Sequence, residues 1–370
     1  MTRGNNKAFD IAVVGTGGIA AIHARDAAKL GGRARLVAAA DTDPERLAEF
    51  GEQWSVSRLY PGLEALLDAE RPDVVHLCTP PGLHAAQAIA CLERGLTVLC
   101  EKPPTRTLAE FDAVAAAAHH GGAFACVFQH RFGSGVQTLR RALASGALGR
   151  PLTAVCHTLW FRPDDYFDLP WRGGWDNEGG GPTLGHGIHQ IDLMLAVLGP
   201  WQEVVAVAAR QARPTATEDL SCAIVTFDSG VIATVVNSLL SPRQTSYLRF
   251  DLEHATVELE HLYGYSDRNW VVTAAPGHED EVAAAWAGGP TGLGSGHGAQ
   301  LNAVLDALEA GTAPPVTPAD ARPTLELVAA VYASAFTRER VRAGEIGPGS
   351  PFYDRMDGVG APWATTAVTG

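Results

Sequence analysis

Lysine is nearly absent from this chain of 370 residues: among its 28 basic residues, only Lys7, Lys29 and Lys102 are lysines. Arginine stays protonated in proteins, whereas a partly buried lysine can lose its proton near neutral pH, so a retained lysine is a candidate for proton chemistry. Lys102 stands in the run Glu101-Lys102-Pro103, directly after a strand-like segment. The simpler interpretation, a surface lysine at the end of a strand, stays open on this evidence alone.

Excess positive charge and long apolar runs are also missing. The formal net charge is −13, which excludes nucleic acid and anionic membrane surfaces from the expected partners. No apolar run reaches the length of a membrane-spanning helix. The polar residues 1–10 lead directly into a strand-like run, so no signal-peptide pattern is expected there.

Closely spaced cysteines are the third absence, because the six cysteines are dispersed and none forms a Cys-x-x-Cys pair. Cys78, Cys100 and Cys126 lie in or beside apolar strand-like runs. This placement predicts buried free thiols in a reducing compartment, and therefore a cytoplasmic protein.

Short apolar runs alternate with helical stretches over residues 9–128, in a chain long enough for two domains. The predicted strands are Phe9–Val14, Arg35–Ala40, Asp73–Thr79, Thr97–Cys100 and Ala123–Phe128. The predicted helices are Ala20–Leu30, Pro44–Gly51, His84–Arg94 and Asp112–His119. Strands that alternate with helices of this length indicate an α/β fold with a parallel sheet and crossover connections.

The turn between the first strand and helix has the G-x-G-x-x-A pattern, in the run Gly15-Thr16-Gly17-Gly18-Ile19-Ala20. The first glycine permits a tight turn, the second lets backbone approach a pyrophosphate, and the alanine allows close helix packing. The helix N-terminus adds N–H groups and a positive dipole end. Glycines also mark ordinary turns, but the position between a strand and a helix favours dinucleotide binding.

Asp41 ends the second predicted strand, where a carboxylate can accept hydrogen bonds from a ribose 2′-hydroxyl. The alternative is that Asp41 caps the following helix. A carboxylate there would repel a 2′-phosphate, so the sequence favours NAD over NADP as cofactor. Arg46 lies further into the next helix, and we expect it to leave this preference unchanged.

Seven segments spread over nearly the whole chain resemble the Gfo/Idh/MocA family of oxidoreductases, in the family's order. They are Thr79-Pro80-Pro81-Gly82-Leu83-His84, Glu101-Lys102-Pro103, Gln129-His130-Arg131-Phe132, residues 145–151, residues 179–192, Glu218-Asp219 and residues 319–337. This agreement is far more specific than the glycine turn alone.

The resemblance implies an N-terminal Rossmann domain and a C-terminal α/β domain on a large, open, mostly antiparallel sheet. We expect an NAD-binding domain over residues 1–128, a substrate-binding and oligomerisation domain over 129–345, and a tail over 346–370. The open sheet face implies a homodimer or homotetramer.

Strand patterns in the second half agree independently of the resemblance. The predicted strands are Leu152–Leu159, Val204–Arg210, Ser221–Phe227, Val231–Leu239, Tyr247–Leu252 and Thr256–Leu259. Asp228-Ser229-Gly230 predicts a hairpin turn between two of them.

The resemblance also assigns the site. It places Lys102 near the nicotinamide and the substrate carbinol, and makes His189, on a helix of the second domain, the acid/base. Removing hydride from a carbinol requires loss of its hydroxyl proton, and histidine titrates near the operating pH. A protonated lysine beside the oxygen would stabilise alkoxide charge. The expected cofactor contacts are Gly15, Thr16, Gly17, Gly18, Ile19, Asp41, Thr79, Pro80, His84, Glu101 and Lys102.

The chain departs from the family at one position. Many members carry an aspartate four residues before this histidine, on the same helical face, where this chain has Gly185. His186 lies three residues before His189, near the same face, and could contact substrate or relay a proton. Two histidines at this spacing could also suggest a metal site, but no third ligand is evident, so no metal is expected.

An aromatic and polar segment, residues 160–177, precedes the glycine run at residues 179–181. Aromatic rings stack on sugar C–H faces while polar groups bind hydroxyls, so the segment suits a small polyhydroxylated substrate. The alternative is that its tryptophans anchor a long loop. We expect Trp171 and Arg172 near the pocket, with His157, Tyr263 and His297 as weaker candidates.

Three functions remain after these observations. The first is an NAD-dependent dehydrogenase acting on a sugar, sugar derivative or cyclitol. The second is a redox-neutral glycosidase that uses NAD for transient oxidation, and the third is a non-catalytic sugar- or NAD-sensing protein. Retention of both Lys102 and His189 favours an enzyme.

Overall fold

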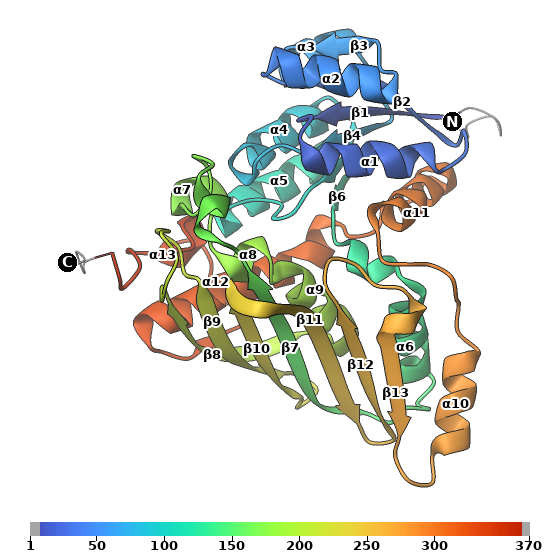
Figure 1. Ribbon diagram of the computed structural model, residues 1–370, viewed down its shortest axis with the longest axis vertical. Coiled ribbons are helices and arrows are strands. Elements are labelled where there is room, and N and C mark those ends of the chain that lie inside the picture. The colour runs from blue at the N-terminus through green and yellow to red at the C-terminus, as the bar shows by residue number, and fades with distance from the viewer. Residues whose placement is uncertain (1–7, 365–370) are drawn as a thin grey trace. The chain divides into compact units, whose positions relative to one another are not determined.

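The structure is a computed structural model that describes residues 8–364, and the chain divides into two compact units (Figure 1). The first unit comprises the chain up to Thr105, Glu110–Val127 and His297–Ala321. The second comprises Arg106–Ala109, Phe128–Gly296 and the chain from Arg322 onward. Within the described residues, no helix has both the length and the apolar character needed to cross a membrane.

The first unit is built on six parallel strands in the order β3-β2-β1-β4-β5-β6. The strands are β1 (Phe9–Val14), β2 (Ala34–Ala40), β3 (Arg58–Tyr60), β4 (Val74–Leu77), β5 (Thr97–Cys100) and β6 (Phe124–Cys126). The helices include α1 (Gly18–Ala28), α2 (Pro44–Trp54), α3 (Leu63–Ala69), α4 (Pro81–Glu93) and α5 (Leu108–His120). The predicted Rossmann sheet is therefore confirmed, although the short β3 and α3 were not predicted.

The strands of the first unit read as continuous apolar runs because the sheet is covered on both faces. All residues of β4 and β5 are buried. The side chains of Cys78, Cys100 and Cys126 are buried, and none forms a disulfide within the described residues, as the sequence predicts.

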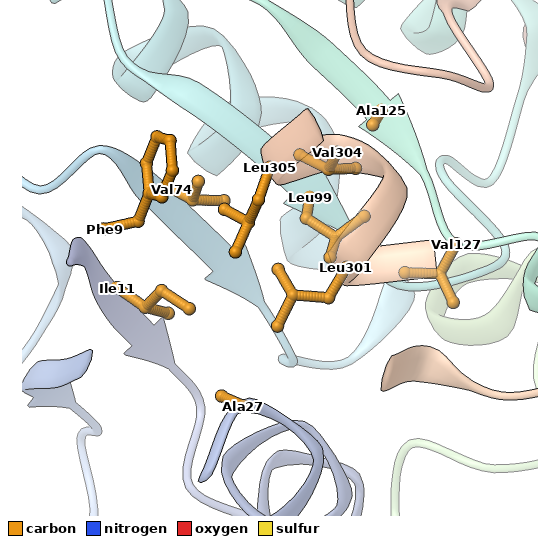
Figure 2. Close-up of a cluster of buried hydrophobic side chains, with 10 residues drawn as sticks. All are labelled: Phe9, Ile11, Ala27, Val74, Leu99, Ala125, Val127, Leu301, Val304 and Leu305. Atoms are coloured by element: carbon orange, nitrogen blue, oxygen red, sulfur yellow. The ribbon is translucent and has the colours of Figure 1, made fainter. Parts of the chain in front are cut away.

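Helix α11 (His297–Ala310) belongs to the core of the first unit, although it follows most of the second unit in the chain. Figure 2 shows Leu301, Val304 and Leu305 of α11 packed with Phe9 and Leu99 of the sheet, all of them buried. The apolar positions of α11 recur at helical spacing and give it one apolar face. The domain boundary predicted over 129–345 therefore differs from the structure at residues 297–321.

The second unit contains an eight-stranded sheet in the order β13-β12-β11-β7-β10-β9-β8-β14. The strands are β7 (Pro151–Phe161), β8 (Trp201–Ala209), β9 (Leu220–Phe227), β10 (Ile232–Ser238), β11 (Leu240–Leu252), β12 (Ala255–His261), β13 (Trp270–Ala274) and β14 (Val341–Arg342). All pairs are antiparallel except β7 with β10. The expected mostly antiparallel sheet is confirmed, as is the β9–β10 hairpin, where Gly230 has φ +84°.

The two faces of this sheet differ. One face packs against helices that include α9 (Ile188–Leu198), and the inward residues Ala154 and Cys156 of β7 are buried. On the other face, Val205, Val207 and Ile224 are exposed to about half or more of their surface, at 48%, 67% and 54%. Alternation along the strands thus leaves an apolar open face among the described residues.

The segment predicted as a tail packs on the second unit up to residue 364. It contains α13 (Pro351–Asp354), and the side chains of Phe352 and Met356 are buried. Trp363 Nε1 donates to the carbonyl oxygen of Ala216, 2.8 Å away. Residues 346–364 are therefore a packed peripheral segment, and residues 365–370 lie outside the described range.

Candidate active site

The glycine turn lies between β1 and α1, and its glycines differ in how much space surrounds them. Gly15 has φ +83°, and a Cβ there would lie 2.9 Å from the carbonyl atoms of Cys78 and from Thr79 Cγ2. A Cβ on Gly17 or Gly18 would meet no atom within 4 Å. Gly15 is thus required by the fold, whereas the other two glycines leave open space at the start of α1.

That open space suits a phosphate group. α1 begins at Gly18, and its N-cap residue, Gly17, has no side chain to cover the first N–H groups. These N–H groups and the positive end of the helix dipole favour an anion. The turn therefore fits the pyrophosphate of a dinucleotide.

Asp41 is held by Thr16 of the glycine turn and by Arg46. Its Oδ2 accepts hydrogen bonds from the Thr16 amide at 2.7 Å and the Thr16 hydroxyl at 2.9 Å. Arg46 donates to both carboxylate oxygens, with Nη2 2.7 Å from Oδ1. Burial opposes ionisation of Asp41, but these hydrogen bonds outweigh it and hold its pKa well below the usual range.

The structure changes the argument about Arg46 and excludes the alternative that Asp41 caps α2. Arg46 reaches Asp41, because its long side chain extends back over the start of α2, so the pair has little net charge. The cap of α2 is Asp43, whose Oδ1 accepts from the Glu45 and Arg46 amides. Asp41 is therefore free of the capping role, but its charge alone no longer decides the cofactor.

His84 connects the loops that follow β4 and β5. Its Nδ1 lies 2.9 Å from the Pro103 carbonyl oxygen, and its Nε2 lies 2.7 Å from that of Thr79. The ring is buried, and burial lowers its pKa although both carbonyls act in the opposite direction. His84 thus positions the backbone beside Lys102 and Thr79; its predicted contact with a cofactor stays a prediction, as does that of Pro80.

Glu101, beside Lys102, is engaged by two buried histidines. Its Oε1 lies 2.9 Å from His23 Nε2 and 2.9 Å from His297 Nε2, while Oε2 accepts from the Lys102 amide at 3.1 Å. Burial opposes ionisation of Glu101, but the two histidines hold its pKa well below the usual range. His76 Nδ1 lies 3.0 Å from His23 Nδ1 and continues the network.

This network gives His297 a contact within the first unit. The residue begins α11 and bonds Glu101, and its expected contact with substrate stays a prediction. Its role in the structure is to hold the carboxylate that precedes Lys102.

Two groups of described residues have ligand atoms close enough to hold a metal ion, and neither includes His186 or His189. In the first, His23, Glu101 and His297 are already joined by hydrogen bonds. In the second, the rings of His254 and His278 stack with centroids 3.8 Å apart and planes within 11°. One ion cannot lie in the planes of both parallel rings, so this arrangement does not favour coordination.

The segment with His186 and His189 is broken into two helices, α8 (Pro182–Gly185) and α9. His186 has φ −122°, and Gly187 is the N-cap of α9. A Cβ on Gly187 would lie 2.0 Å from Asn237 Oδ1, so the close approach of β10 requires glycine. The expectation that Gly185, His186 and His189 share one helical face is therefore wrong.

The two histidines have different neighbours. His189 stacks on His130, with ring centroids 5.1 Å apart, and His130 lies 5.0 Å from His261. His186 lies edge-to-face against Trp160 at 5.1 Å. Burial lowers the pKa of His261 to about 4, so this neighbour is neutral near pH 7. Sequence reasoning quoted His130 only within a motif and missed His261.

A buried carboxyl group supports α8. Glu218 accepts from the Gly181 and Thr183 amides, each at 3.0 Å, and from the Tyr332 hydroxyl at 2.8 Å. Burial raises the pKa of Glu218 to about 7, against the effect of these hydrogen bonds. Glu218, of the Glu218-Asp219 motif, therefore holds the backbone at the start of α8, the helix that directly precedes His186.

The aromatic segment gathers around His186. Tyr166 lies 6.2 Å from the His186 ring, and the guanidinium of Arg172 lies over both Tyr166 and Trp171. Tyr263 contacts Trp160 at 4.9 Å. The structure thus brings Trp171 and Arg172 into the same cluster as His186.

His157 lies elsewhere. It pairs with Tyr247 of β11 and Val236 of β10, both on the open face of the sheet. The alternation of β7 points His157 away from the face covered by α9, so it is not part of this cluster.

Comparisons with known proteins match both units. The "Oxidoreductase family, NAD-binding Rossmann fold" matches residues 9–129, and the "GFO/IDH/MocA C-terminal domain" matches residues 136–258. D-apiose dehydrogenase of Paraburkholderia graminis is 29% identical over 252 residues, covering 65% of this chain and 63% of that protein. D-glucoside 3-dehydrogenase of Escherichia coli is 32% identical over 168 residues, covering 44% and 46%.

The chain thus spans less than two thirds of the length of these curated relatives. Among solved structures, the WlbA dehydrogenase of Bordetella pertussis, in complex with NADH and UDP-GlcNAcA, has a TM-score of 0.81 at 26% identity. That similarity covers 91% of this chain and 99% of the other.

Proposed function

The chain belongs to the Gfo/Idh/MocA family of oxidoreductases, and from this premise we propose that it is an NAD-dependent dehydrogenase of a sugar, sugar derivative or cyclitol. The observation that carries the proposal is the glycine turn. Its open space at the start of α1 fits a pyrophosphate, in a unit where the loops after β4 and β5 are fixed by His84 and Glu101. Related dehydrogenases act on apiose, glucosides and inositol.

When bound, the nicotinamide cofactor supplies the hydride acceptor or donor. His189 takes the carbinol proton during oxidation and returns it during reduction, since histidine titrates near neutral pH. Lys102 stabilises the negative charge on the carbinol oxygen. Trp171, Arg172 and His186 bind the substrate, and His186 is the reserve proton carrier if His189 is replaced.

NAD is the proposed cofactor in preference to NADP. The position of Asp41 at the end of β2 supports the preference, while the Arg46 ion pair reduces it. We also propose a cytoplasmic homodimer or homotetramer that acts on small polyhydroxylated substrates without nucleic acid or membrane partners. The exposed apolar face with Val207 and Ile224 supports self-association, because patches of this kind mark interfaces.

The test is a panel of sugars and cyclitols with free NAD, read as absorbance of NADH. We expect NADH to accumulate with at least one member of the panel. Cleavage of a glycoside without net NADH would overturn the proposal in favour of a redox-neutral hydrolase. Ligand binding without either reaction would overturn it in favour of a sensing protein.

A further inference from the structure

Arg162 and Arg172 converge on one aromatic ring. The guanidinium carbon of Arg172 lies 3.7 Å from the centroid of the Tyr166 ring, and that of Arg162 lies 5.1 Å from it. Arg162 also lies 4.8 Å from the Trp160 ring, and Arg172 lies 4.5 Å from the Trp171 ring. Aromatic faces hold guanidinium groups in place while leaving their N–H edges available for a planar anion.

Neither guanidinium forms an ion pair with a carboxylate within residues 8–364. The Nε atoms of Arg162 and Arg172 are buried and have no hydrogen-bond partner in that part of the chain. Nη1 of Arg162 donates only to neutral acceptors, the Phe161 carbonyl at 2.9 Å and Gln244 Oε1 at 3.3 Å. Two partly desolvated cations thus lie together without an ion-pair partner in this part of the chain, since Glu178, which acts on Arg172 only through its charge, accepts a hydrogen bond from the Gly173 amide.

Two acidic side chains of residues 160–177 form ion pairs with arginines other than Arg162 and Arg172. Asp164 pairs with Arg213 at 2.9 Å, and Asp176 pairs with Arg355 at 2.9 Å. The whole chain has 41 acidic residues against 28 basic ones, so carboxylates are not scarce. Like charges held close in a partly dry site repel one another, and an anionic ligand removes that repulsion.

The cationic pair shares its aromatic neighbours with His186. Trp160 lies 5.1 Å from the His186 ring and 4.8 Å from the Arg162 guanidinium. Tyr166 lies 6.2 Å from His186 and contacts both arginines. A ligand that reaches His186 therefore lies beside the two guanidinium groups.

We propose that Arg162 and Arg172 form an anion-binding subsite that selects substrates carrying a carboxylate or phosphate group. Guanidinium groups bind both anions through paired N–H donors. The inference rests on the proposed dehydrogenase function and narrows its substrate class to acidic sugars, such as uronic acids, aldonic acids or sugar phosphates.

The experiment compares matched probes with the full-length protein and NAD: D-glucose against D-glucuronate and D-glucose 6-phosphate, and D-galactose against D-galacturonate. Binding of each probe is followed in parallel by tryptophan fluorescence, so a probe that is not oxidised is still scored. We expect one anionic probe to exceed its neutral partner by about 10- to 100-fold in affinity or kcat/KM, the range of a charge-assisted hydrogen bond. The carboxylate and phosphate arms identify which anion is bound.

Arg162→Met should remove most of this preference while changing neutral probes little, and Arg172→Met should lower affinity and kcat/KM for the anionic probes more than for the neutral ones. The matched control is Arg213→Met, because Arg213 also stacks on a ring of this segment, 4.9 Å from the Phe161 centroid, but is paired with Asp164. The control should keep the preference. If either Met variant does not fold, the wild-type preference should still fall as NaCl rises from about 0.05 to about 0.5 M.

The outcomes separate the two proposals. Neutral probes oxidised as well as anionic ones, or equal losses on both classes in the Arg variants, would overturn the subsite and leave the dehydrogenase. Salt-sensitive anion binding without NADH formation from any probe would support the subsite and contradict the dehydrogenase. An anion preference that Arg213→Met removes and Arg172→Met keeps would also overturn the subsite.

Discussion

In the first unit, the residues that follow neighbouring strands are held together: Thr16 by Asp41, and the Thr79 and Pro103 carbonyls by His84. In the second unit, the histidine segment is shaped by residues distant in the chain, Glu218 below α8 and Asn237 against Gly187. The predicted cofactor contacts of the first unit thus depend on a regular sheet. The histidine segment of the second unit depends on particular tertiary contacts, so it can vary while the sheet stays the same.

The largest expected effect tests whether the stability of the first unit depends on α11. Leu305→Ala should cost about 2–5 kcal/mol of unfolding free energy, because Leu305 is fully buried in the core of the first unit. Leu308 is only partly buried against the same cluster, so Leu308→Ala should cost less. Urea unfolding followed by circular dichroism measures both. Equal losses of unfolding free energy in the two variants would contradict the buried position of Leu305 in this core.

The next effect concerns the carboxyl group of Glu218, which bonds the backbone at the start of α8. The pKa of Glu218 is about 7 in the folded chain against 4.5 for an ordinary glutamate, so the folded state binds more protons between these values. The wild type should therefore lose stability, of order 3 kcal/mol, as the pH rises from about 4.5 to about 7. Glu218→Gln should remove this part of the slope. Urea unfolding at several pH values measures the difference, and parallel curves for the two proteins would refute the assignment.

Two glycines of the turn sharpen the comparison within the first unit. Gly15→Ala should destabilise the fold by about 1–3 kcal/mol, because φ is +83° and the new Cβ meets the Cys78 carbonyl. Gly17→Ala should leave stability nearly unchanged but weaken NADH binding, since its methyl group enters the open space at α1. Thermal unfolding and NADH fluorescence titration test the pair. Unchanged NADH affinity in Gly17→Ala would move the pyrophosphate away from this turn.

The smallest expected effect is a shift in cofactor choice of about tenfold, the size of one modest charge interaction. Arg46→Ala leaves the Asp41 carboxylate without its ion pair, so the preference for NADH over NADPH should increase. Asp41→Ala releases the Arg46 guanidinium, so the preference should fall. Fluorescence titration with both cofactors gives the ratio for each variant. Shifts in the same direction would show that the pair acts only through the fold.

The glycine turn could be predicted because its information is local: Gly15 to Ala20 follow one strand and begin one helix. The break at His186 and Gly187 could not, because the residue that packs against Gly187 there is Asn237, fifty positions further along. The ion pair between Arg46 and Asp41 could not be predicted for a related reason. Its position in α2 is visible in the sequence, but the reach of its side chain back to Asp41 is not.

Residues 297–321 show the same limit at the level of domains. The apolar spacing of Leu301, Val304 and Leu305 predicts a helix with one apolar face. That spacing does not say which sheet the face covers, and the structure places it on the first unit.

The central claim is that Lys102 and His189 carry the proton chemistry and that cofactor affinity depends little on either side chain. With a substrate found in the sugar panel, Lys102→Met and His189→Ala should each lower kcat by about 10²–10⁴-fold while NADH affinity stays near that of the wild type. Lys29→Met is the matched control, because Lys29 is exposed and, among residues 8–364, forms an ion pair only with Asp26; it should retain full activity. Turnover near the wild-type rate in His189→Ala or Lys102→Met would contradict the account.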